Sequence, residues 1–115
     1  MTNQDYILST TTDLVKKDFS LEFRENPISE EQLLHWLSDY IAEMLEYKLE
    51  ALFSILYLMD VNEDAVHATL APSAVEPANV AIAQLVIDRL RRKAETRLAY
   101  RQAPPTEDDE DAPDW

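Results

Sequence analysis

The chain has 115 residues, no glycine, no cysteine and a formal net charge of −13, from 10 Lys and Arg against 23 Asp and Glu. Without glycine, neither the phosphate-binding loops of nucleotide-binding proteins nor the nucleophile elbow of hydrolases can be built. Without cysteine there is no disulfide framework and no thiolate metal site. The acidic excess disfavours nucleic acid and anionic lipid as partners.

The first residues lack the basic and apolar segments of a signal peptide. The longest apolar run, residues 51–59, is far shorter than the roughly 20 residues that a membrane span requires. We therefore expect a cytoplasmic protein with no membrane contact and no cofactor.

Residues 1–28 carry the least regular pattern of the chain. The apolar spacing predicts a helix over about residues 5–17, followed by an extended segment to Pro27. Phe19, Leu21 and Phe23 also alternate with polar residues, and this pattern fits a short strand.

Residues 29–59 begin with a strong helix start. Ser29 and Gln32 form a capping-box pattern, and Ile28 and Leu33 occupy the positions of a hydrophobic staple. A single helix over residues 29–59 would be about 46 Å long, whereas a compact domain of this size has a radius of gyration near 13 Å.

Lys48 adds to this conflict, because it falls within the apolar arc of that helix. We favour a break near residues 46–48; alternatives are a lysine that extends past its neighbours to solvent or a helix that projects into a dimer. Residues 51–59 are apolar almost all round, which predicts a buried central helix.

Two further helices are expected. Asn62 is a suitable N-cap, with Val61 and Val66 as its staple pair, for a short helix that ends near Ala71. Pro77 suits the start of a last helix that continues to about Gln102. Its predicted buried stripe comprises Val80, Ala83, Ile87, Leu90, Ala94 and Leu98.

The predicted fold is thus all-α: a compact antiparallel helical bundle of four to five helices, formed by residues 1–102 as a single domain. Beyond Ala103, two prolines and then mostly acidic residues follow, so we expect residues 103–115 to form a disordered acidic tail.

Two patterns resemble metal sites. Asp60-x-Asn62-x-Asp64 resembles the start of an EF-hand loop, but Ala65 and Ala71 replace the glycine and glutamate that such a loop requires, so we favour a helix cap. His35 and His67 each follow a glutamate by four residues, which favours solvated pairs over metal ligation. We predict no metal site.

An acidic stripe borders two aromatic side chains, Trp36 and Tyr47, on the helix that begins at residue 29. We expect a solvated face rather than a catalytic site, and the exposed aromatics favour protein binding. The stripe consists of Asp39, Glu43, Glu46 and Glu50.

Six of the ten basic residues lie between Arg89 and Arg101, and on a helix Arg89, Arg92 and Lys93 share a face. They could pair with the acidic stripe or tail, bind nucleic-acid phosphates, or recruit an acidic protein; we favour the first. Ile82 and Leu85 lie earlier on that face, outside the buried stripe, which predicts contact with a second subunit.

Residues 107–114, most of which are acidic, precede Trp115. This arrangement is similar to the ends of bacterial single-stranded DNA-binding proteins, whose terminal aromatic binds pockets of partner proteins. Asp114 separates the proline from the aromatic here. The similarity is one of mechanism, and we assign no family.

The patterns together predict a non-catalytic, homodimeric protein-interaction or regulatory module. Its predicted contact residues are Trp36, Tyr47, Ile82, Leu85, Arg89, Arg92, Lys93 and Trp115. The alternative is a nucleic-acid-associated regulator, in which the basic helix binds the nucleic acid and the acidic tail competes with it.

Overall fold

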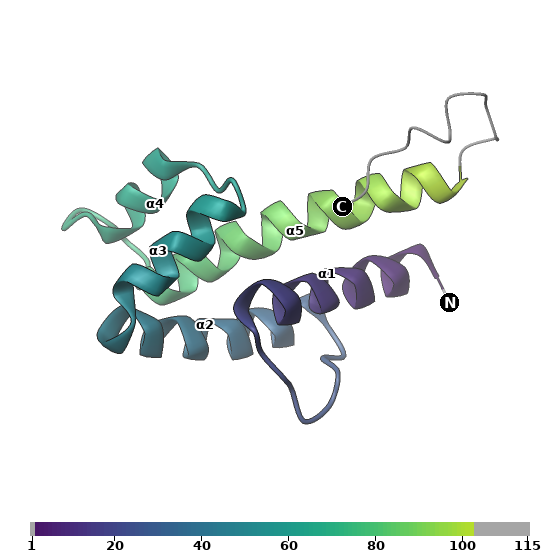
Figure 1. The fold of residues 1–115 in the computed structure, drawn as a ribbon, viewed down its shortest axis with the longest axis horizontal. Coiled ribbons are helices and arrows are strands. Elements are labelled where there is room, and N and C mark those ends of the chain that lie inside the picture. Colours follow the sequence, from purple (N-terminus) through teal and green to yellow (C-terminus); the bar gives the residue numbers. More distant parts are fainter. Residues whose placement is uncertain (1, 103–115) are drawn as a thin grey trace.

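The computed structural model describes residues 2–102, which form five helices and no strand (Figure 1). This confirms the predicted all-α fold, including the helix in the N-terminal segment. The predicted tail, residues 103–115, lies outside the described residues. None of the helices described is both long and apolar enough to cross a membrane. The helices are α1 (Asn3–Phe19), α2 (Glu30–Tyr47), α3 (Leu49–Leu58), α4 (Glu63–Leu70) and α5 (Ala78–Gln102).

The longest helix, α5, is the centre of the bundle, and α1, α2 and α4 all pack against it. In the view of Figure 1, α1 and α2 lie below α5 and α3 and α4 lie above it. The guanidinium of Arg101, near the end of α5, lies 4.9 Å from the ring of Tyr6, near the start of α1. The side chain of Asn79, at the start of α5, donates to the carbonyl oxygen of Ser38 in α2 at 3.1 Å. Glu30, at the start of α2, pairs with Arg91, further along α5. With these contacts, α1 and α2 both run antiparallel to α5.

The core contradicts two predictions about α5. Ile82, expected on a spare apolar face, is 0% exposed, and Leu85 is half-buried and packs against the core. The cause is the central position of α5: helices on several sides bury a wider arc than the narrow stripe that periodicity alone suggests. Conversely, Val80 and Leu98, predicted to be buried, are only partly covered.

The predicted break in the long helix is confirmed. Helix α2 ends at Tyr47, α3 begins at Leu49, and Lys48 between them leaves the helical conformation with φ −141° and ψ 47°. The Lys48 side chain is exposed. The break therefore keeps an ammonium group out of an apolar interface, where burial would be costly.

The polar caps also form as predicted. Ser29 Oγ accepts a hydrogen bond from the backbone N–H of Gln32 at 3.0 Å, and Asn62 Oδ1 accepts one from Ala65 at 2.9 Å. The predicted hydrophobic staple at the start of α2 is wrong, because Ile28 is 85% exposed while Leu33 is buried. The Gln32 side chain accepts from the backbone N–H of Ile28 rather than from that of Ser29.

Helix α3 is not the buried central helix that its composition predicts. Leu52 and Leu56 lie in the core, but Tyr57 is 73% exposed and Leu58 is 82% exposed. Helix α3 packs mainly against α2, so it lies at the edge of the bundle, and α5 takes the central place. An apolar surface is left open as a result.

Candidate protein-binding groove

Helices α3 and α4 enclose an apolar groove at one end of the molecule. It has a volume of about 160 Å³ and lies between the last two turns of α3 and the first turns of α4. This is close to the roughly 150 Å³ of an engineered cavity that accepts benzene, so the groove can hold one aliphatic or phenyl side chain. The lining residues are Phe53, Leu56, Tyr57, Val61, Glu63, Val66 and His67.

The turn between the two helices builds one wall of the groove. Asp60 adopts a left-handed conformation with φ 61°, which lets the N–H of Val61 donate back to the carbonyl of Leu56 at 3.1 Å. Val61 is thereby directed into the core, where Val66 at the start of α4 is also buried. The groove is therefore held by the helix-ending motif of α3 and the Asn62 cap of α4.

Outside histidine, the charged side chains of α3, α4 and the turn between them are all acidic. Residues 49–88 contain no lysine or arginine. Four carboxylates of α3, α4 and the turn between them are exposed: Glu50, Asp60, Glu63 and Asp64. A ligand with an apolar anchor and flanking cations would therefore meet a complementary surface.

The predicted aromatic contact residues are not brought together. The Trp36 ring is half-buried and lies 5.2 Å from the ring of Phe23, which comes from the loop after α1. Tyr47 is exposed at the end of α2, eleven residues further on and hence about 16 Å away along the helix. Trp115 lies outside the described residues.

The acidic stripe is exposed, but it does not pair with the basic residues of α5. Asp39, Glu43, Glu46 and Glu50 are all exposed. His35 Nε2 lies 3.8 Å from the Oδ2 of Asp39, rather than pairing with Glu31 as its spacing predicts. No ion pair joins the stripe to Arg89, Arg92 or Lys93 in the part of the chain that the structure describes.

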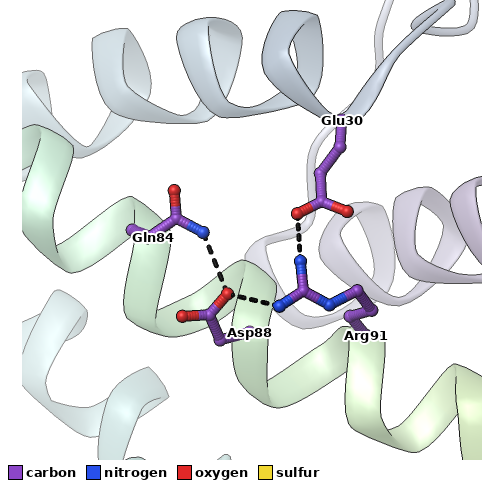
Figure 2. A network of polar contacts seen from close by, with 4 residues as sticks. All are labelled: Glu30, Gln84, Asp88 and Arg91. Carbon is purple, nitrogen blue, oxygen red and sulfur yellow. Dashed lines mark hydrogen bonds and ion pairs between the residues drawn. The ribbon is translucent and has the colours of Figure 1, made fainter.

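Two of the basic residues of α5 bond to other parts of the fold, whereas others are open to solvent. Arg91 is structural: Figure 2 shows its guanidinium between the carboxylates of Glu30 in α2 and Asp88 in α5, where Asp88 also accepts from Gln84 at 2.9 Å. Arg89 Nε donates to the carbonyl oxygen of Met59 at 3.1 Å. Arg92 is exposed and Lys93 is half-exposed.

A metal site has no support in the geometry. Residues 2–102 contain no group of three or more His, Asp or Glu side chains placed to hold one ion. The Asp60–Asp64 segment forms the helix cap described above.

At the start of α1, the pKa of the Asp5 carboxyl is lowered, mainly because the backbone N–H of Thr2 donates to it at 3.2 Å, with a further contribution from the Thr2 hydroxyl.

The fold and its surfaces define an all-α domain with an apolar groove. Comparison of the chain with protein-family models, curated proteins and solved structures finds no match. The groove residues Phe53, Tyr57 and His67 were not predicted as contact residues. The available signal was the stretch from Leu49 to Asp88, where a helix apolar almost all round coincides with the absence of cationic side chains.

Proposed function

We propose that this chain is a non-catalytic protein-interaction module, and that the groove between α3 and α4 binds an amphipathic helix of a partner protein. The observation that carries the proposal is the exposure of Tyr57 and Leu58, at 73% and 82%, beside an apolar groove. Exposed apolar surface next to a concave site is typical of helix-in-groove recognition.

Charge selects among the possible partners. The groove is bordered by exposed carboxylates and has no lysine or arginine on α3 or α4. The favoured partner therefore carries a leucine or phenylalanine anchor flanked by lysine or arginine. Such charges raise the association rate and fix the orientation more than they add affinity.

Self-association is a less favourable use of the same groove. Two copies would each bring a net charge of −13, and like charges oppose their approach. The predicted homodimer also loses one of its proposed contacts, because Ile82 is buried. Light scattering across a dilution series tests it: a monomer at high concentration would refute the homodimer and leave the heterologous partner in place.

The binding test uses a synthetic amphipathic helix made of leucine and lysine, with a leucine–glutamate helix of the same pattern as the control. Titration of the full chain, followed by amide NMR shifts, should give changes that cluster on α3 and α4 with the lysine peptide. Equal binding of both peptides, or shifts that leave α3 and α4 unchanged, would overturn the proposal.

Two tyrosines supply matched variants, because Tyr57 and Tyr47 are equally exposed at 73%. Only Tyr57 lines the groove. Tyr57→Ala should weaken binding of the lysine peptide about tenfold or more, as expected for an aromatic contact residue, while Tyr47→Ala should leave it unchanged. The reverse order would transfer the site to the end of α2, where Tyr47 lies.

A further inference from the structure

A second surface, distinct from the groove, lies on the C-terminal half of α5. Arg89, Lys93 and Arg97 recur every four residues and follow one side of the helix, with Arg92 beside them. We call these four residues the basic face. The two acidic residues of α5 are directed elsewhere: Asp88 binds Arg91, and Glu95 lines a cavity with Arg91 and Glu30.

The basic face has no carboxylate partner in the described part of the chain. Within residues 2–102 the ion pairs involve Lys16, His35 and Arg91, and none reaches the basic face. Arg89 donates a hydrogen bond to the Met59 carbonyl, which is a neutral partner. A cluster of four uncompensated cations is unexpected in a chain with a net charge of −13, because counter-charges are plentiful.

The chain itself supplies a complementary segment. Residues 107–111 read Glu-Asp-Asp-Glu-Asp, and they follow the end of α5 after only four intervening residues, two of which are prolines. The prolines prevent continuation of the helix, so the chain can change direction there.

The distances are compatible with contact. An extended segment covers about 3.3 Å per residue, so residues 107–111 can lie up to about 17–30 Å from Gln102. Along α5, Arg97 and Arg92 lie about 7.5 Å and 15 Å back from Gln102. The acidic run therefore has ample length to lie along the basic face in the reverse direction.

We infer that the acidic segment 107–111 of this chain docks on the basic face of α5. The contact is electrostatic and competes with any other polyanion for the same four cations. Neutralisation of the segment therefore exposes a surface suited to acidic ligands, including nucleic-acid phosphates. Docking of this kind weakens steeply with salt, because Arg92 is exposed and Arg89, Lys93 and Arg97 are only partly covered.

The test uses the full chain with a nitroxide at Ala112→Cys, which is a unique label site because the chain has no cysteine. The nitroxide should broaden the amide signals of residues 89–97. The broadening should fall when the five acids are replaced by their amides, and also in 1 M salt, where the Debye length is about 3 Å.

Two triple variants complete the test. Arg92→Gln, Lys93→Gln and Arg97→Gln together should reduce the broadening to the level of the neutralised segment. The control changes Lys17, Arg24 and Lys48 to Gln, which alters the net charge equally but leaves α5 intact and should preserve the broadening. An unchanged pattern in the α5 variant, or an equal loss in the control, would overturn the inference.

A nucleic-acid titration provides an independent readout. The neutralised chain should bind a short DNA duplex at low salt more tightly than the native chain does. Equal binding of DNA by the two chains would show that the segment does not shield the basic face.

Discussion

Arg89 Nε donates a hydrogen bond to the carbonyl oxygen of Met59 at 3.1 Å. Met59 is the C-cap residue of α3, so this bond joins the middle of α5 to the end of α3. The carbonyl lies at the end of a helix, where carbonyl oxygens lack partners within the helix. The bond therefore ties the groove between α3 and α4 to the helix around which the bundle is built.

Arg89→Met should lower the free energy of unfolding by about 1–2 kcal/mol, because it leaves a helix-terminal carbonyl without its charged donor. Denaturant unfolding of the full chain measures the change. Arg92→Met, on the same helix but exposed, is the control and should lie within about 0.5 kcal/mol of the native chain. Equal losses in the two variants would contradict a specific role for Arg89.

A substitution at Thr11 should raise the free energy of unfolding, whereas Arg89→Met should lower it. Its side chain is 1% exposed, and its hydroxyl has no hydrogen-bond partner among the described residues. Thr11→Val replaces the hydroxyl by a methyl group of similar size, so it should raise the free energy of unfolding by about 1 kcal/mol.

The neighbouring Thr12 is the matched control. It is similarly buried, but its hydroxyl donates to the carbonyl of Leu8 at 2.7 Å. Thr12→Val should therefore give no gain in thermal or denaturant unfolding. A larger gain for Thr12→Val than for Thr11→Val would contradict the account.

These cases show which features could be predicted from sequence. The starts of α2 and α4 were predictable because Ser29 and Asn62 each satisfy a backbone N–H group only three residues away, so the information is local. The break at Lys48 was predictable because a charge within an apolar arc requires a local solution. Neither feature depends on the remainder of the fold.

Burial was harder to predict, because it depends on which helix the others cover. Ile82 and Leu58 show the two errors: the first is buried because neighbours surround α5, and the second is exposed because α3 lies at the edge. Apolar pattern alone made α3 the central helix. The groove residues were missed for the same reason, since their role depends on how α3 and α4 are placed.

A chain without glycine must close its helices in another way. Ser20 after α1 and Asp60 after α3 both have positive φ, at 53° and 61°. In each case the next residue donates to a carbonyl five positions earlier, as in a glycine-ended helix. A side chain in this conformation costs about 1 kcal/mol, less for aspartate than for most residues.

Ser20→Gly should therefore raise the melting temperature, with a gain in the free energy of unfolding of up to about 1 kcal/mol. Asp60→Gly should gain less, because aspartate tolerates the conformation better. Ser9→Gly, at an exposed position inside α1, is the control and should lose about 0.5 kcal/mol. A loss at Ser20 similar to that at Ser9 would show that the conformation costs nothing there.

Asp5 predicts a dependence of stability on pH. Its pKa is lowered in the folded chain because Thr2 donates to the carboxylate. A lowered folded-state pKa stabilises the fold above the unfolded-state pKa, and the contribution disappears as pH falls through the folded-state value. The difference in stability between the native chain and Asp5→Asn should therefore shrink on acidification. A difference that is constant with pH would contradict this assignment.

The ion pair between Glu30 and Arg91 joins the start of α2 to α5 (Figure 2). The two side chains are 40% and 35% exposed, so water screens their attraction. A double-mutant cycle with Glu30→Gln and Arg91→Met should give a coupling of about 0.5–1 kcal/mol, at the upper end for a surface pair because Asp88 also orients the guanidinium at 2.9 Å.

The pair of Lys16 and Glu22 is the comparison for that cycle, with 3.9 Å between its charged atoms and a glutamate that is 90% exposed. Its coupling should be close to zero, since an exposed pair at that separation gains little over two hydrated ions. The Glu30–Arg91 coupling should also decrease as salt is raised, but it should not vanish, because its partly covered position limits screening. Similar couplings for the two pairs would mean that the network around Arg91 adds nothing beyond an ordinary surface contact.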